Sequence, residues 1–213
     1  MRNRFDQQLH HLDEQLTHMG ELCEIAISKV TQALKEGSAE QARIVVAEDE
    51  EIDQMEKEIE RLCLKLLLQQ QPVARDLRTI SSALKMISDM ERIGDQAADI
   101  AEIARDVQAG KLADETPMGD MARTAISMVT DSVDAFVRED LDLAHQVIAR
   151  DDRVDQLFLN MRKQLANMIG RGEDASACLD MLMIAKYFER IGDHACNIAQ
   201  WVEYALTGQY EDD

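Results

Sequence analysis

The sequence ERIGDQAADIAE at residues 91–102 returns as ERIGDHACNIAQ at residues 189–200, about a hundred positions later. Both copies place a glycine among strong helix formers, although glycine disfavours a helix by about 1 kcal/mol relative to alanine. Both also carry carboxylates four residues apart, which lie one above the other on a helix face. The repeated stretch therefore indicates a duplicated helical unit with an acidic surface.

Two further strings return at nearly the same spacing. AISKVT at 26–31 corresponds to AISMVT at 125–130, and VVAEDEEIDQ at 45–54 corresponds to VIARDDRVDQ at 147–156. The offset is 99 residues for the first pair, 102 for the second and 98 for ERIGD. Because each change in offset falls between expected helices, where a folded repeat tolerates length changes, the chain reads as a tandem duplication.

Composition and periodicity predict that nearly all of the chain is helical. Only two prolines and nine glycines interrupt 213 residues that are rich in Ala, Leu, Ile, Met, Glu, Gln and Arg, which favour helices. Apolar residues recur at alternating steps of three and four, as on one face of a helix. The expected helices are a first one ending near Gly37, a second from after Ser38 to Pro72, a third ending near Ala109, and Met118–Phe136, Leu141–Ile169 and Ala175–Leu206.

We therefore predict an all-α fold of six helices, arranged as a tandem repeat of two antiparallel three-helix bundles. The first bundle covers residues 1–109 and the second residues 118–208. The sequence GKLADETP at 110–117 has the composition of a linker, and residues 209–213 form an acidic tail. Helices of about 30 residues are about 45 Å long, so we expect a rod whose bundles pack side by side or end to end.

The formal net charge of −19 limits the partners of the protein. Such a charge repels the phosphates of nucleic acids and of anionic lipid surfaces. The sequence has no apolar run long enough to insert into a bilayer, and its first residues lack the apolar core of a signal peptide. We expect a cytoplasmic protein whose cysteines are reduced packing residues, at Cys23, Cys63, Cys178 and Cys196.

The acidic residues of the first repeat form two columns on consecutive helices. Glu91, Asp95 and Asp99 follow one another at steps of four, and Asp49 and Asp53 have the same spacing on the preceding helix. Consecutive helices of an antiparallel hairpin face each other, so the two columns converge. Like charges at this spacing repel by a few tenths of a kcal/mol per pair, and a bound cation would offset that repulsion.

The second repeat carries the same arrangement. Its columns are Glu189, Asp193 and Asn197 on one helix and Asp151 and Asp155 on the other. Carboxylates stacked on two helices suit a hard divalent ion such as Mg²⁺, Mn²⁺ or iron. We therefore predict one metal site in each repeat.

The glycine inside each motif fits this interpretation. Gly94 and Gly192 remove a side chain beside the acids, which lets a neighbouring helix or a hydrated ion approach. The alternative is a solvated acidic face with weak ion pairs from Arg92 to Asp95 and from Arg190 to Asp193.

With these repeats and acidic motifs, and above all with the string ERIGDHACNIA, nearly the whole chain resembles the PhoU family of phosphate-transport regulators. The resemblance implies a cytoplasmic α protein of two similar bundles, often a homodimer, that binds divalent or iron ions at its acidic motifs. It implies partners: the ATPase subunit of a phosphate ABC transporter and the sensor histidine kinase of the phosphate regulon. It also implies a role, which is to repress the phosphate-starvation regulon and restrain phosphate uptake when phosphate is plentiful.

The resemblance transfers candidate ligands onto this chain. They are Glu91, Asp95, Glu189 and Asp193, with support from Asp49, Asp53, Asp151 and Asp155, and with Asp99 as an additional candidate. One departure between the repeats matters here, because the second repeat has Asn197 where the first has Asp99. The two sites therefore differ in charge, and we expect them to differ in affinity or in metal.

Two other function classes compete with this interpretation. A helical-bundle enzyme with a di-metal centre uses Glu-x-x-His pairs on facing helices, and none of the five histidines follows a glutamate by three. We therefore expect no enzyme, and we interpret His194 as a packing or surface residue. A purely structural coiled-coil adaptor would explain the periodicity of the first helix but not the repeated acids.

Overall fold

The computed structural model describes residues 2–70, 72–107 and 110–209, and all secondary structure in these ranges is helical. This confirms the predicted all-α class. The helices are α1 (Arg2–Glu36), α2 (Ala39–Gln70), α3 (Arg75–Asp106), α4 (Gly110–Asp114), α5 (Met118–Arg138), α6 (Leu141–Gly170) and α7 (Ala175–Thr207).

The ends of the long helices follow local chemistry. Gly37 directly follows α1 and Gly208 directly follows α7, and both glycines have a positive φ, of 64° and 77°, which a residue with a side chain rarely adopts. Asp140 and Asp174 cap the N-termini of α6 and α7, because their carboxylates accept hydrogen bonds from backbone N–H groups of the first turn. Gly37 thus ends the first helix where the sequence predicted it.

One segment differs from its expected form. The sequence GKLADETP reads as loop throughout, but its first residues form the short helix α4. Leu112 is buried against the core, and the Thr116 hydroxyl donates to the carbonyl oxygen of Leu112, so packing and a local hydrogen bond order this turn. Residues 108–109, near the expected end of the third helix, and residues 210–213 of the acidic tail lie outside the described residues.

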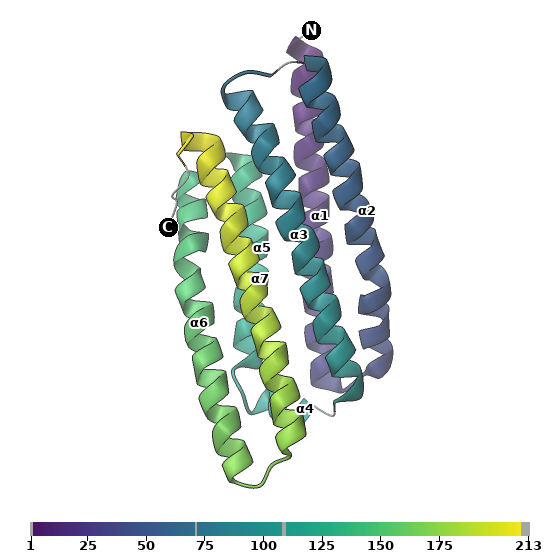
Figure 1. The fold of residues 1–213 in the computed structure, drawn as a ribbon, viewed down its shortest axis with the longest axis vertical. Helices are drawn as coiled ribbons and strands as arrows, with labels where there is room; N and C mark the ends of the chain where they lie inside the picture. The colour runs from purple at the N-terminus through teal and green to yellow at the C-terminus, as the bar shows by residue number, and fades with distance from the viewer. Residues whose placement is uncertain (1, 71, 108–109, 210–213) are drawn as a thin grey trace.

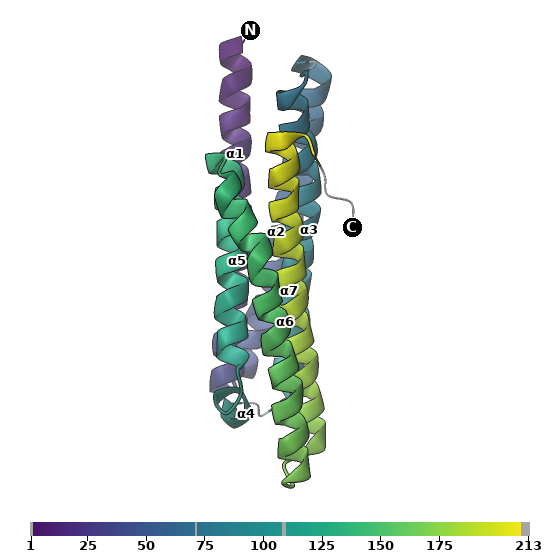
Figure 2. The same cartoon turned by 90° about the vertical axis from the view of Figure 1, so that its left-hand side faces the viewer.

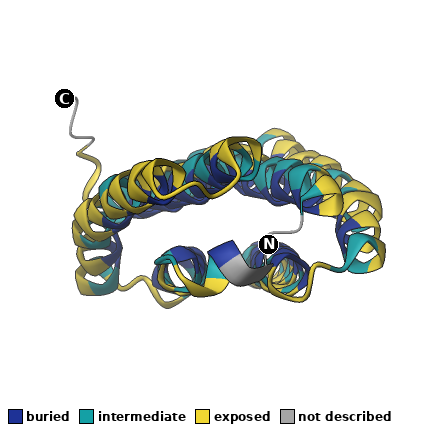
Figure 3. Cartoon of the chain, turned by 90° about the horizontal axis from the view of Figure 1, so that it is seen from below, coloured by how far each residue is buried: buried dark blue, intermediate teal, exposed yellow. Residues whose placement is uncertain are grey.

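The six long helices form two three-helix bundles that lie side by side, α1–α3 in one and α5–α7 in the other (Figures 1 and 2). The helices α2, α3, α7 and α6 follow one another in a curved row, and α1 and α5 pack together on one face of it (Figure 3). The contact between α3 and α7 joins the two bundles along the middle of the row. The molecule is elongated, as the helix lengths predicted.

The core fills the space between the row and the pair α1 and α5, where the buried faces of the helices meet (Figure 3). The apolar stripe of the first helix lies in it, with Leu12, Leu16 and Met19 fully buried. All four cysteines are buried, as expected for packing residues. In the described part of the chain, no helix combines the length and the apolar character that crossing a bilayer requires.

Candidate metal centres

The structure brings three of the predicted carboxylates of the first repeat together. Asp53 of α2 and Glu91 and Asp95 of α3 each offer one carboxylate oxygen, and these atoms lie within 4.8 Å of one another. All three side chains are partly buried. Among the described residues this is the only group of three or more such ligands at that spacing. We call these residues together with Asp49 the first acidic cluster.

Asp49 lies beside this triad and lacks a partner of its own. Its Oδ1 atom is buried and accepts no hydrogen bond. Burial first, and then the neighbouring carboxylates of Asp95, Asp53 and Glu91, raise the pKa of Asp49 to about 6. A buried oxygen without a partner is costly, so this position fits a cation that would accept it as a ligand.

Gly94 makes the position of Asp49 possible. A Cβ atom at residue 94 would lie 2.7 Å from Asp49 Oδ1, closer than non-bonded atoms approach, and at a tight 3.0 Å from Ile52 Cδ1. The glycine therefore lets α2 and its carboxylate lie directly against α3. This agrees with the expectation that the glycine allows a neighbouring helix to approach the acidic residues.

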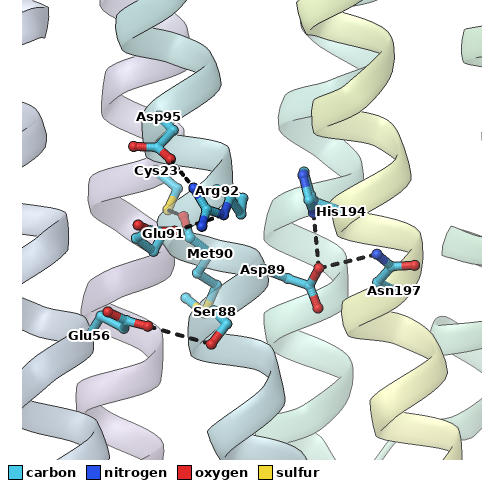
Figure 4. A network of polar contacts seen from close by, with 10 residues as sticks. All are labelled: Cys23, Glu56, Ser88, Asp89, Met90, Glu91, Arg92, Asp95, His194 and Asn197. Carbon is cyan, nitrogen blue, oxygen red and sulfur yellow. Dashed lines mark hydrogen bonds and ion pairs between the residues drawn. The ribbon is translucent and has the colours of Figure 1, made fainter.

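Two exposed cations also touch the first acidic cluster. Arg92 Nη1 lies 2.7 Å from Asp95 Oδ2, and Arg92 Nε lies 3.3 Å from Glu91 Oε2 (Figure 4). Lys57 Nζ lies 3.8 Å from Asp53 Oδ2. Both cationic side chains are more than half exposed, so these ion pairs contribute little. The pKa of Glu91 is still raised, by burial first and by Asp95 second.

The second acidic cluster consists of Asp151, Asp155, Glu189 and Asp193. Burial first, and then the charges of Asp193, Asp155 and Glu189, raise the pKa of Asp151 to about 6, so the four carboxylates are neighbours. Within the described residues, however, no three of them approach one another as closely as the triad of the first cluster.

The cations around the second cluster are also arranged differently. Lys186 Nζ donates a hydrogen bond to Glu189, which is almost fully buried. The guanidinium of Arg190 lies 5.7 Å from the centre of the Tyr187 ring, so Arg190 contacts an aromatic ring where the alternative interpretation predicted an ion pair with Asp193. Gly192 would place a Cβ at an ordinary 3.4 Å from Val154, and it therefore touches an apolar side chain where Gly94 touches a carboxylate.

Asp99 and Asn197, which extend the two columns, face the contact between the bundles. Burial raises the pKa of Asp99, with Glu102 and Asp95 adding to it, while Arg190 and a hydrogen bond from Tyr187 of α7 oppose the increase. Asn197 Nδ2 donates to Asp89 Oδ1 at 3.1 Å (Figure 4). Asp99 thus lies outside the close triad.

His194 was expected to be a packing or surface residue, and the structure gives it a more specific place. Its Nδ1 atom lies 2.9 Å from Asp89 Oδ1, so it joins α7 to α3 across the two bundles (Figure 4). Sequence reasoning missed Asp89 as its partner, because the contact joins residues 105 positions apart that meet only when the two bundles pack.

Comparison with known proteins identifies the family of this chain. The model of the PhoU domain matches residues 16–104 and again residues 118–202. A "phosphate-specific transport system accessory protein PhoU homolog" of Clostridium acetobutylicum is 35% identical over 214 residues, which are 99% of this chain and 98% of that protein. A protein of the same name from Caulobacter vibrioides is also 35% identical, over 96% of this chain and 90% of its own.

Solved structures agree over the same length. The crystal structure of the phosphate transport system regulatory protein PhoU from Streptococcus pneumoniae superposes with a TM-score of 0.90 at 29% identity, covering 98% of this chain and 99% of that one. PhoU from Pseudomonas aeruginosa gives a TM-score of 0.85 at 33% identity, covering 96% and 100%. Because sequence and structure match along both repeats, the chain belongs to the PhoU family.

Proposed function

We propose that this protein is a cytoplasmic regulator that couples a phosphate ABC transporter to a sensor histidine kinase. In this role it contacts the ATPase subunit of the transporter and the kinase of the phosphate regulon. When phosphate is plentiful it represses the phosphate-starvation regulon and restrains phosphate uptake. We further propose that it acts as a homodimer and holds a divalent metal ion at its acidic motifs.

The observation that carries the regulatory proposal is the match of both repeats, over nearly the whole chain, to proteins named for accessory and regulatory roles in phosphate transport. Membership of this family also bears out the expectation of a regulatory accessory protein rather than an enzyme. The two bundles present long helical surfaces, which suit contacts with other proteins.

The metal proposal rests on the first acidic cluster. Asp53, Glu91 and Asp95 would hold the ion, and Asp49 would supply an oxygen that otherwise lacks a partner. Oxygen ligands from carboxylates suit Mg²⁺, Mn²⁺ or iron(II). An ion there would remove the repulsion among four carboxylates on α2 and α3. It would thereby fix the spacing of these two helices and the surface that partners contact.

The regulatory role is tested by deleting the gene in its own host and measuring a phosphate-starvation reporter, such as alkaline phosphatase, in high-phosphate medium. We expect high reporter activity in the deletion strain and repression again after complementation. Reporter activity that stays repressed without the gene would contradict the role. Sedimentation of the purified protein at micromolar concentration tests the homodimer, since a monomer at that concentration would argue against it.

The metal part is tested by calorimetric titration of chelated protein with Mn²⁺ and Mg²⁺. The matched variant carries Glu91→Gln and Asp95→Asn, which keep the shape of both side chains but remove their charge. We expect saturable binding that is lost in this variant. Affinity of the wild type for the purified ATPase subunit and for the kinase is then compared with and without the ion, and equal affinities would separate metal binding from regulation.

A further inference from the structure

The two acidic clusters differ at a pair of equivalent positions beside them. The repeat offsets are 102 residues between α2 and α6 and 98 residues between α3 and α7. Glu56 of α2 therefore corresponds to Phe158 of α6, and Ser88 of α3 corresponds to Lys186 of α7. Between the repeats, an acidic residue is replaced by an aromatic one and a neutral residue by a cation.

In the first repeat this pair is a weak polar contact. Ser88 Oγ donates to Glu56 Oε1 at 3.4 Å (Figure 4). Glu56 also raises the pKa of Glu91, so its charge adds to the negative potential of the first acidic cluster. The cations there, Arg92 and Lys57, are more than half exposed and screened by water. Among the described residues, the cations paired with the first cluster are therefore mostly exposed.

In the second repeat the same pair forms an internal counterion. Lys186 Nζ donates to Glu189, whose side chain is 12% exposed. The ammonium group also lies 5.5 Å from the centre of the Phe158 ring, within the range of an attractive cation–π contact. Phe158 and Glu189 come from the two helices that carry the second acidic cluster, so Lys186 is held between them.

We propose that Lys186 is a built-in counterion that takes the place of a metal ion at the second acidic cluster, so that this chain binds its metal ion at the first cluster. The inference rests on the metal part of the proposed function. An ammonium group hydrogen-bonded to Glu189 occupies a ligand oxygen, and its positive charge repels an incoming divalent ion. A metal ion would have to displace it and leave it half-buried without a partner, which is unfavourable.

The proposal is tested by measuring Mn²⁺ bound to chelated full-length protein by equilibrium dialysis. In a chain that keeps Lys186, the pair Glu91→Gln and Asp95→Asn should abolish Mn²⁺ binding. The pair Glu189→Gln and Asp193→Asn should leave Mn²⁺ binding unchanged. Lys186→Ser, which copies Ser88 of the first repeat, should add at least about one equivalent of Mn²⁺ per chain. The added binding should disappear when Lys186→Ser is combined with Glu189→Gln and Asp193→Asn. Lys163→Ser, an exposed lysine of α6, is the control for loss of charge.

The outcomes separate this inference from the metal proposal. If the variant Glu189→Gln with Asp193→Asn binds less Mn²⁺ than the wild type does, both clusters bind metal. The counterion inference then fails and the metal proposal stands. If only proteins with Lys186→Ser bind Mn²⁺, the counterion inference stands and the first-cluster site fails. If no variant binds, both fail.

A measurement without metal gives an independent check. In chelated protein, Glu189→Gln removes the partner of Lys186 and should lower the melting temperature. Glu91→Gln removes one of several repelling carboxylates and should leave the melting temperature unchanged or raise it. Equal changes in melting temperature for Glu189→Gln and Glu91→Gln would overturn the inference. They would show that Lys186 does not stabilise the second cluster.

Discussion

Asp89 in α3 accepts a hydrogen bond from Asn197 in α7, with 3.1 Å between Oδ1 and Nδ2. The repeat places Asp99 at the position equivalent to Asn197 and Tyr187 at the position equivalent to Asp89. Asp99 in turn accepts a hydrogen bond from Tyr187. Both of these contacts thus pair a carboxylate on α3 with a donor on α7. The difference between Asp99 and Asn197 therefore serves this contact, because an aspartate at 197 would face another carboxylate.

The substitution Asn197→Asp should destabilise the protein at pH 7.5. It removes the donor to Asp89 and brings two partly buried carboxylates together, which we expect to lower the free energy of unfolding by about 1–3 kcal/mol. For a chain of this size each kcal/mol corresponds to about 2–4 °C in melting temperature. Thermal unfolding followed by circular dichroism measures the shift.

Exchanging the two groups provides the control for this substitution. The double variant Asp89→Asn with Asn197→Asp again pairs one amide with one carboxylate and should recover most of the lost stability. Asp99→Asn keeps an acceptor for Tyr187 and should change the melting temperature by less than Asn197→Asp does. An unchanged melting temperature in Asn197→Asp would show that the contact between the bundles does not depend on this pair.

The two motif glycines should respond differently to alanine. At Gly94 the added Cβ would lie 2.7 Å from Asp49 Oδ1, so α2 and α3 must move apart. We expect a loss of about 1–3 kcal/mol. At Gly192 the Cβ meets Val154 at 3.4 Å, and the gain in helix propensity, about 1 kcal/mol, offsets any small strain. Urea unfolding of both variants tests this difference, and equal losses would mean that Gly192 is as tightly confined as Gly94.

The raised pKa of Asp49 predicts a pH-dependent effect of Asp49→Asn. The pKa is 3.8 in the unfolded chain and about 6 in the folded protein, so the folded state holds the proton more strongly. The stabilisation that this provides is complete below about pH 4 and is lost as the pH rises through 6. In chelated protein, Asp49→Asn should therefore be more stable than the wild type at pH 7.5, by about 1 kcal/mol after allowance for solvent screening.

At pH 4.5 the difference between Asp49→Asn and the wild type should be small, because most of the wild-type carboxyl is then protonated. Differential scanning calorimetry at both pH values measures the two differences. An Asp49→Asn variant that is less stable than the wild type at pH 7.5 without metal would show that the ionised carboxylate is favourable there. Adding Mn²⁺ should reverse the order if Asp49 is a ligand.

The buried cysteines should be unreactive in the folded protein. Burial raises the pKa of Cys23 and of Cys63 to about 12, so almost no thiolate forms at pH 8, and both side chains are fully buried. We expect slow reaction of these thiols with a disulfide reagent under native conditions and rapid reaction in denaturant. Mass spectrometry after brief native labelling identifies the sites, and modification of Cys23 within seconds would show that α1 separates readily from its neighbours.

The helices and their ends could be read from the sequence because their causes are local. The 3.6-residue period of apolar side chains, Pro72 between α2 and α3, and Gly37 after α1 act within a few residues of the chain. The short helix α4 could not be predicted in this way, because it is stabilised by Leu112, which packs on distant parts of the core. The resemblance to the family, too, could be recognised in the sequence, from the two repeats, their acidic motifs and the string ERIGDHACNIA.

The sequence by itself determined the helical class, the duplication and the carboxylates that have equivalent places in the two repeats. Only the tertiary structure decided that Asp53, Glu91 and Asp95 converge in the first repeat while Lys186 meets Glu189 in the second. Spacing along one helix says which side chains share a face. The distance from that face to the next helix depends on the side chains between them, such as Gly94 against Asp49 and Gly192 against Val154, and these pairs exist only after the helices have packed.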